Sequence, residues 1–191
     1  MDSKELFLRR TIRRFRQEPL PEEAIREILD AARQASCAAN LQRLRYVAVT
    51  NPGLVAAMLP NLAFGMMVNP RRQPTAGVNS PMAYIVVCCD CEPGASLHAD
   101  AGAAIQSMEL AAWGQGIGCC WLGSHKAEPV AQLLGLEHPE RILYVVALGY
   151  PAEDPCREDV QAGDSVKYYL DDADRIHIPK YTVDAVTTWK R

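Results

Sequence analysis

The segment from residue 99 to residue 115 constrains the fold of this chain more than any other. Small and apolar residues, including Ala101, Ile105, Met108 and Ala112, cover nearly the whole circumference of the helix that this segment predicts. A helix without a continuous polar face is buried on most of its sides. We therefore expect a central helix that packs closely against its neighbours.

Apolar runs before and after this helix predict the elements that surround it. Residues 83–89 form an unbroken apolar run, which indicates a strand covered on both faces. Apolar residues at helical spacing, or shorter apolar runs, predict the other elements: helices over 21–32, 52–59 and 128–134, and strands over 46–49, 119–122 and 142–148. Together they predict one α/β domain, in the broad α+β sense, over residues 1–191.

Two stretches lack such patterns. Residues 61–80 are rich in Pro, Gly, Arg and Asn and predict a long loop, which we expect to help shape a substrate pocket. Arg71 and Arg72 in it could contact a nicotinamide phosphate, although their composition favours an exposed basic loop. The end of the chain is polar apart from residues 176–179, so an extension over 165–191 is expected to lie on a partner subunit.

Composition excludes several classes of protein. The chain has 191 residues, is 49% hydrophobic and carries a net charge of -3, which excludes a disordered tail and predicts no binding to nucleic acid or membrane. No stretch approaches the roughly 20 apolar residues of a membrane span, and the N-terminus does not resemble a signal peptide. The seven cysteines are odd in number and lie largely in apolar runs, which favours reduced thiols in a cytoplasmic protein.

Familiar reactive motifs are also missing. Gly114, Gly116 and Gly118 close a predicted helix and precede a strand, the reverse of the dinucleotide-binding order. Adjacent cysteines in a strand point to opposite faces, so residues 88–91 and 119–120 do not predict a metal site. The sequence contains no nucleophile elbow and no phosphate-binding glycine loop. An enzyme with this sequence would therefore depend on a bound cofactor.

The start of the chain is unusually basic for an acidic protein. Residues 9–15 read Arg-Arg-Thr-Ile-Arg-Arg-Phe, which places four guanidinium groups and a hydroxyl close together. Arginine is always charged and can grip two phosphate oxygens at once. The cluster is typical of a site for the phosphate of a nucleotide or cofactor, although a solvated basic turn would have the same composition.

Four blocks lie in order along the chain, at residues 9–15, 35–42, 100–123 and 177–180. In the same order, they resemble segments of the nitroreductase family of flavin mononucleotide (FMN) enzymes. The second block resembles a Pro-Ser-x-x-Asn-x-Gln-Pro segment, the third a central helix and the strand after it, and the fourth a basic C-terminal element. The resemblance implies a three-layer fold, with a mixed and mostly antiparallel sheet between helices. It also implies a homodimer with two FMN molecules at its interface, each touched by both subunits.

The resemblance also implies which residues bind the cofactor. Those at its phosphate and ribityl end would be Arg9, Arg10, Thr11, Arg13 and Lys180. Those approaching the isoalloxazine, from the other subunit, would be Ser36, Cys37 and Asn40. Those contacting the pyrimidine side, largely through backbone, would be Trp121, Leu122 and Gly123.

Two positions depart from the family pattern. Cys37 lies where serine is common, which weakens the hydrogen bond expected there. Arg43 follows Gln42 where proline is usual. The added cation is consistent with a solvated charge, and equally with attraction of an anionic substrate or an NAD(P)H phosphate.

The resulting hypothesis is an FMN-dependent oxidoreductase that works by a ping-pong mechanism. NADH or NADPH would deliver a hydride to flavin N5, and an electron-poor acceptor such as a nitroaromatic, quinone or enone would then take it. No catalytic side chain is predicted, because the flavin carries the reaction. Two other classes stay open at this point: a protein that stores, senses or fragments FMN without nicotinamide turnover, and a thiol or metal protein built on the cysteines.

Overall fold

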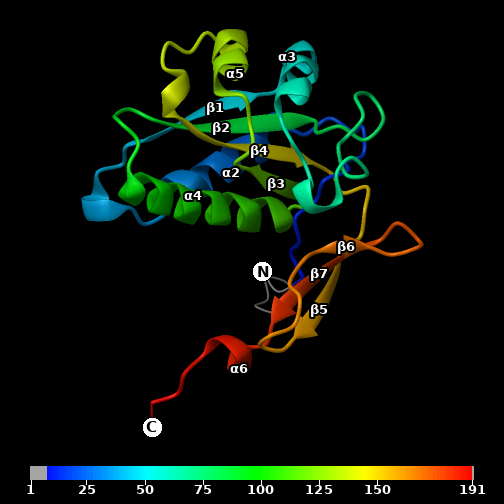
Figure 1. Ribbon diagram of the computed structural model, residues 1–191. Helices are drawn as coiled ribbons and strands as arrows, with labels where there is room; N and C mark the ends of the chain where they lie inside the picture. The colour runs from blue at the N-terminus through cyan, green and yellow to red at the C-terminus, as the bar shows by residue number, and fades with distance from the viewer. Residues whose placement is uncertain (1–7, 191) are drawn as a thin grey trace.

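A four-stranded sheet forms the centre of the protein, which is described here by a computed structural model covering residues 8–190. Its strands are β1 (Leu44–Val49), β2 (Ala83–Cys89), β3 (Gly118–Leu122) and β4 (Ile142–Gly149), in the order β1-β2-β4-β3. Each neighbouring pair is antiparallel (Figure 1). Thr11 adds an isolated parallel bridge to Cys119 at the β3 edge, so the sheet is mixed and mostly antiparallel, as expected.

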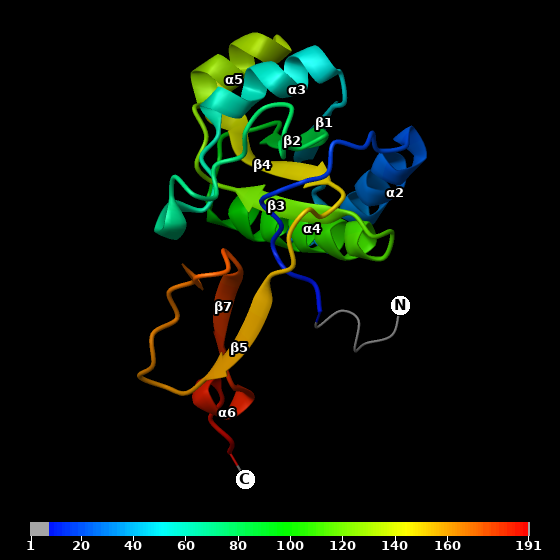
Figure 2. The same ribbon diagram turned by 90° about the vertical axis from the view of Figure 1, so that its right-hand side faces the viewer.

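Helices cover both faces of this sheet and make three layers, which confirms the predicted fold class (Figure 2). The helices α2 (Glu22–Arg33) and α4 (Ala95–Trp113) pack on one face, and α3 (Pro52–Met58) and α5 (Ala127–Leu134) pack on the other. Strand β2 is buried along its whole length. Its residues alternate between the two cores: Ile85 and Val87 face α2 and α4, and Tyr84 and Val86 face α3 and α5.

Helix α4 is the central helix that the sequence predicts, although it begins at Ala95, four residues earlier. Its two acidic residues, Asp100 and Glu109, are both buried. Gly114 caps its end, and β3 begins at Gly118. The glycines thus end a helix and lead into a strand, which confirms that they do not form a dinucleotide-binding turn.

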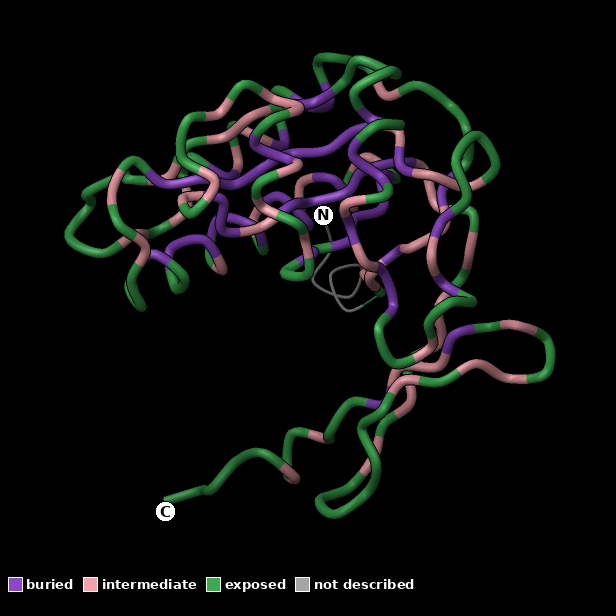
Figure 3. Tube along the Cα trace, turned by 45° about the horizontal axis from the view of Figure 1, so that its top comes forward, coloured by how far each residue is buried: buried purple, intermediate pink, exposed green. Residues whose placement is uncertain are grey.

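The last fifth of the chain contains elements that the sequence does not predict. The sequence predicts only a polar extension with one apolar patch at 176–179. The structure contains β5 (Cys156–Val160), β6 (Tyr169–Leu170), β7 (Ile176–Tyr181) and the short helix α6 (Val183–Val186). The strands form a second sheet in the order β5-β7-β6, with β5 and β7 parallel. This small sheet stands apart from the main layers, and most of the chain around it is exposed (Figures 1 and 3). Within residues 8–190, no helix is long and apolar enough to cross a membrane.

Candidate functional site

Two apolar side chains anchor residues 9–14, here called the basic corner, beside the edge strand β3. Ile12 and Phe15 are fully buried, and the arginines lie between and before them. The backbone N–H of Ile12 donates to the carbonyl of Cys119 at 2.9 Å. The corner is therefore part of the fold rather than a solvated turn, and it lies at the start of β3.

Arg9 has a carboxylate partner inside the protein. Its guanidinium lies 3.2 Å from Oε2 of Glu109 on α4. Burial raises the pKa of Glu109, and the Arg9 charge opposes that shift. Arg9 therefore shares its charge with Glu109, which leaves less of it for an external anion.

Arg10 lies near a second cation that the sequence analysis did not select. Burial lowers the pKa of Arg10, and the positive charge of Arg157 on β5 lowers it further. Asp159 on the same strand balances part of this charge: its Oδ1 lies 3.2 Å from Nε of Arg157, and its charge opposes the lowering of the pKa of Arg10. Arg157 is therefore a further cation near Arg10, and it already has a carboxylate partner. Only the folding of β5 onto the corner reveals it, because its sequence neighbours are acidic.

The side chain of Arg13 is the clearest unsatisfied group at the corner. Its Nε and Nη1 atoms are buried, and neither has a hydrogen-bond partner among the described residues. Its guanidinium carbon lies over the ring of Tyr168, 5.0 Å from the centroid. Buried donors normally have partners, so these atoms indicate that a hydrogen-bond acceptor from outside residues 8–190 binds here.

Arg14, the fourth arginine of the corner, is directed elsewhere. Its Nη1 lies 2.7 Å from Oδ2 of Asp174, and its Nη2 donates to the carbonyl of Arg71 at 2.9 Å. The guanidinium thus connects segments of the protein and is not directed at an outside anion.

The residues predicted for the pyrimidine side lie farther along the same edge. Trp121 is 39% exposed and packs edge-on against Tyr144, with ring centroids 5.1 Å apart. The Leu122 side chain is buried, so its backbone is the part available to a ligand. Gly123 is exposed and follows the strand. Four steps along the chain, at about 3.3 Å each, lead from Cys119 to Gly123, or roughly 13 Å.

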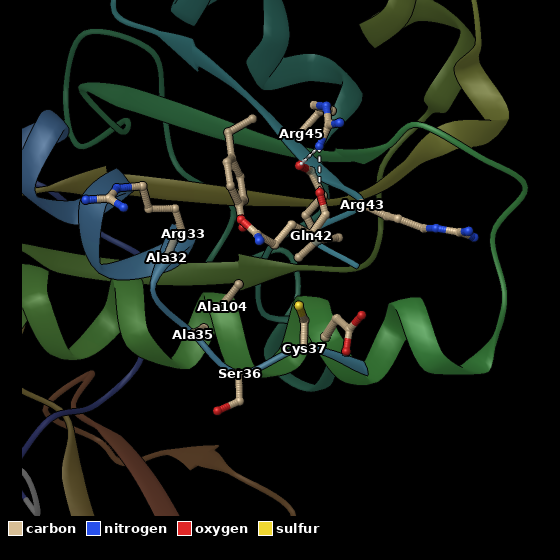
Figure 4. Close-up of a pocket in the computed structure, with 12 residues that line it drawn as sticks. Ala32, Arg33, Ala35, Ser36, Cys37, Gln42, Arg43, Arg45 and Ala104 are labelled. Carbon is tan, nitrogen blue, oxygen red and sulfur yellow. Dashed lines mark hydrogen bonds between the residues drawn. The ribbon is translucent and has the colours of Figure 1, made fainter. Parts of the chain in front are cut away.

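Ser36 and Cys37 line a cavity of about 290 Å³ between α2, β1 and α4 (Figure 4). The loop that holds them is fixed to α4, because Asp100 accepts a hydrogen bond from the backbone N–H of Ala38 at 2.8 Å. Arg43 lies at the same cavity and stays exposed. Asn40 is exposed, has a left-handed backbone with φ of 53° and does not line the cavity.

Within one chain, this loop and the basic corner are far apart. Ala38 contacts α4 at Asp100, and Arg9 contacts it at Glu109, nine residues later. A helix rises about 1.5 Å per residue, so these two contact points lie roughly 13 Å apart along its axis.

Lys180 lies on β7, paired in register with Asp159 of β5. The charge of Asp159 also acts on Arg10. Arg10, Arg157 and Lys180 are therefore associated through the same two strands. The family resemblance groups Lys180 with Arg10, whereas composition and spacing alone could not, because 170 positions separate them.

The structure shows the environment of Arg72 in the 61–80 loop and the state of the cysteines. Both interpretations of Arg72, contact with a nicotinamide phosphate and an exposed basic loop, are wrong, because its side chain is 1% exposed and pairs with Glu153 and Asp174. Arg71 is exposed and pairs with Asp174 at 2.7 Å. All seven cysteines are free thiols, and four of them are buried. Among residues 8–190, no group of three or more His, Cys, Asp or Glu side chains is placed to hold a metal ion.

The structure is therefore that of a three-layer α+β protein with a cluster of arginines beside one edge of its sheet. The family model described as "Nitroreductase family" matches residues 7–81 and 92–150. The chain therefore belongs to the nitroreductase family, whose named members are oxidoreductases.

Individual relatives agree with this assignment. A candidate NADH dehydrogenase/NAD(P)H nitroreductase from Methanothermobacter thermautotrophicus is 32% identical, with 91% of this chain and 84% of the relative covered. A protein of the same description from Archaeoglobus fulgidus is 31% identical, with 93% and 97% covered. A candidate nitroreductase from Desulfovibrio desulfuricans, solved in complex with FMN, superimposes with a TM-score of 0.64 at 27% identity, covering 79% of this chain and 86% of that one.

Proposed function

We propose that this protein is an FMN-dependent oxidoreductase that transfers hydride from NAD(P)H to an electron-poor acceptor such as a nitroaromatic, quinone or enone, by a ping-pong mechanism. The observation that carries the proposal is the pair of buried Arg13 nitrogen atoms without partners among residues 8–190. The FMN complex of the Desulfovibrio desulfuricans relative supports the choice of anion. When bound, the flavin supplies the hydride-accepting and hydride-donating atom.

The residues present suit a phosphate monoester. Arg10 and Arg13 would supply guanidinium groups, and Lys180 and the Thr11 hydroxyl would add further donors. Arg157 would add a third guanidinium nearby, shared with Asp159 at 3.2 Å. Because Arg9 already pairs with Glu109, it would add little unbalanced positive charge to the corner. The role of this group of residues is to bind and orient the cofactor by its charged end.

The opposite end of the β3 edge suits a flat ring. Trp121, Leu122 and Gly123 would contact the pyrimidine side, with Leu122 acting through its backbone because its side chain is buried. Backbone N–H groups near the ring would stabilise negative charge and so tune the reduction potential. The roughly 13 Å between the corner and Gly123 separates phosphate binding from ring binding.

We further propose a homodimer in which Ser36, Cys37 and Asn40 approach the cofactor held by the partner subunit. Two features support it. The exposed positions of α4, which include Ala99, Ala103 and Gln106, carry no charge, because both acidic residues of this helix are buried. The end of the extension also exposes large apolar side chains, namely Val183, Val186 and Trp189.

The loop over 61–80 would border the substrate side of the site. A Cβ on Gly65 would lie 3.5 Å from Cδ of Arg13, so this loop packs against the corner. Met66 and Met67 next to it are exposed apolar groups that suit a flat organic acceptor.

We propose that residues 1–191 form one domain, with 165–191 as the extension. We place the protein in the cytoplasm, because its seven thiols are free.

An absorbance spectrum of the freshly purified protein tests the cofactor, and anaerobic mixing with NADH or NADPH tests turnover. We expect a flavin spectrum that bleaches on reduction and returns when an acceptor is added. A colourless protein that refuses added FMN would refute the proposal. A flavin that does not bleach would instead favour storage or sensing of FMN.

A further inference from the structure

The carboxylate of Glu153 holds the backbone of the basic corner from inside the fold. Its Oε1 accepts hydrogen bonds from the backbone N–H groups of Arg13 and Arg14. The N–H of Ala152 donates to the carbonyl of Arg14 at 2.9 Å, so the backbone of the corner both donates and accepts hydrogen bonds in this region. The Glu153 side chain is 7% exposed, and a lone carboxylate in such a place would be costly.

Arg72 supplies the opposite charge from the 61–80 loop. Its Nε lies 3.1 Å from Oε2 of Glu153. The same guanidinium reaches Asp174, with Nη1 3.1 Å from Oδ2 and Nη2 donating to the Asp174 carbonyl. One buried side chain therefore connects the group that holds the corner to the chain that enters β7.

Asp174 gathers the remaining charges of this region. It lies 2.7 Å from Arg14 and 2.7 Å from Arg71, in addition to its contacts with Arg72. It precedes β7, the strand that carries Lys180. Three segments far apart in the sequence, at 13–14, 71–72 and 174, thus meet in a single ion-pair cluster.

The side chains of Arg72 and Arg13 also flank the same glycine. A Cβ on Gly65 would fall 2.7 Å from Cβ of Arg72 and 3.5 Å from Cδ of Arg13. Gly65 has a φ of 57°, in the left-handed region that favours glycine. Movement of Arg72 would therefore displace the turn against which Arg13 packs.

We propose that Arg72, Glu153 and Asp174 form a positioning relay. This relay holds Arg13 in the orientation that meets the cofactor's phosphate, and it also fixes the small C-terminal sheet relative to the basic corner. The relay acts through Arg13 and does not need to touch the cofactor. Its cofactor role rests on the proposed function, whereas its coupling of the corner to the small sheet does not.

Comparison of FMN with riboflavin tests the cofactor role, because riboflavin lacks the phosphate. In Arg72→Met we expect FMN affinity to fall about tenfold or more, as when other groups that orient a ligand residue are removed. Riboflavin affinity should change by less than about twofold, so the ratio of the two affinities falls. Arg26→Met removes an exposed pair with Glu22 on α2 and should leave both affinities unchanged.

Hydrogen exchange of the cofactor-free protein tests the coupling itself. Arg72→Met should speed exchange in peptides over 9–16 and 171–181, with no change over β2. A second variant, Arg72→Met with Glu153→Gln, leaves no unpaired carboxylate but keeps an oxygen for the two N–H groups of the corner. It should recover protection over 9–16 but not over 171–181, and it carries the test if the single variant does not fold.

Equal losses of FMN and riboflavin affinity, or exchange that rises uniformly across the protein, would overturn the relay. So would exchange over 9–16 and 171–181 that stays at the wild-type rate. A wild-type protein that binds no FMN refutes the proposed function, and the exchange pattern then decides the relay alone.

Discussion

Ile12 lies directly against Gly118, and the contact leaves no room for a side chain on the glycine. A Cβ on Gly118 would fall 2.6 Å from Cγ1 of Ile12 and 2.8 Å from its Cβ. The basic corner and the edge strand therefore approach each other as closely as they do because residue 118 is glycine. The position of the arginines depends on this approach.

Gly118→Ala is expected to destabilise the protein by about 1–3 kcal/mol, the usual cost of forcing extra volume into a packed core. The β-branched Ile12 is fully buried and cannot move aside cheaply. Unfolding in urea, followed by circular dichroism, measures the change. Gly94→Ala is the matched control: nothing lies within 4 Å of its Cβ, so its effect should stay within about 0.5 kcal/mol. Equal effects at the two positions would contradict the argument.

Arg13→Met should weaken FMN binding by about ten- to a hundredfold, because a hydrogen bond to a charged group contributes about 1.5–3 kcal/mol. Binding of riboflavin should change much less. Titration of the cofactor-free protein by flavin fluorescence gives both affinities. Arg16→Met in the same segment is the control, since Arg16 is exposed and pairs with Glu18 at 3.1 Å. If both variants bind FMN like the wild type, the buried nitrogen atoms of Arg13 serve another purpose.

The central elements could be predicted from the sequence because continuous apolar patterns indicate that they are buried. Strand β2 is apolar at every position, and α4 is apolar nearly all round, so each has only one environment that suits it. The basic corner could be recognised for a similar reason: its arginines are local in sequence, with apolar anchors between and after them.

The small sheet and the partners of the arginines could not be predicted in this way. Strand β5 reads Cys-Arg-Glu-Asp-Val, and no position in it is fully buried, so no apolar pattern marks it. The burial of Arg72 depends on Glu153 and Asp174, which lie about 80 and 100 residues away. Composition alone therefore favours an exposed loop at Arg72, and only tertiary contacts reverse that reading.

The cysteines should divide into two groups by reactivity. Burial raises the pKa of Cys88 to about 11 and that of Cys120 to about 12, so these thiols stay protonated and shielded. Iodoacetamide at about pH 8 should modify the partly exposed thiols of the native protein first; these are Cys37, Cys91 and Cys156. Mass spectrometry of the modified peptides measures the order. Early labelling of Cys120 would contradict it.

The same reagent tests where the cofactor lies. Bound FMN should slow modification of Cys37, which is proposed to approach the ring, and leave Cys91 at its original rate. Cys91 is the internal control, because it lies outside the predicted site and is also partly exposed. Equal protection of both thiols by FMN would indicate a general tightening of the fold instead of contact at Cys37.

His177 should make the small sheet less stable as the pH rises. Its Nε2 lies 3.0 Å from Asp171 and its Nδ1 lies 2.6 Å from Glu158, and hydrogen bonds to these carboxylates raise its pKa above the usual 6.5. The folded state thus binds the proton more tightly than the unfolded state. This contribution is fully present below the unfolded pKa of about 6.5 and is lost as the pH rises through the higher folded pKa.

Urea midpoints at about pH 6 and about pH 8.5 for the wild type and His177→Gln measure this effect. We expect the wild type to lose stability across this interval by more than the variant, because glutamine keeps polar contacts but has no proton to release. The ring of Tyr169 stacks on His177 with centroids 4.9 Å apart, and its hydroxyl donates to Glu158 at 2.9 Å. Tyr169→Phe keeps the stacked ring and removes only this hydrogen bond, so the direction of the pH dependence should stay that of the wild type, because both carboxylates still face His177. A pH slope that is identical in the wild type and His177→Gln would show that the charge on this histidine does not hold the sheet together.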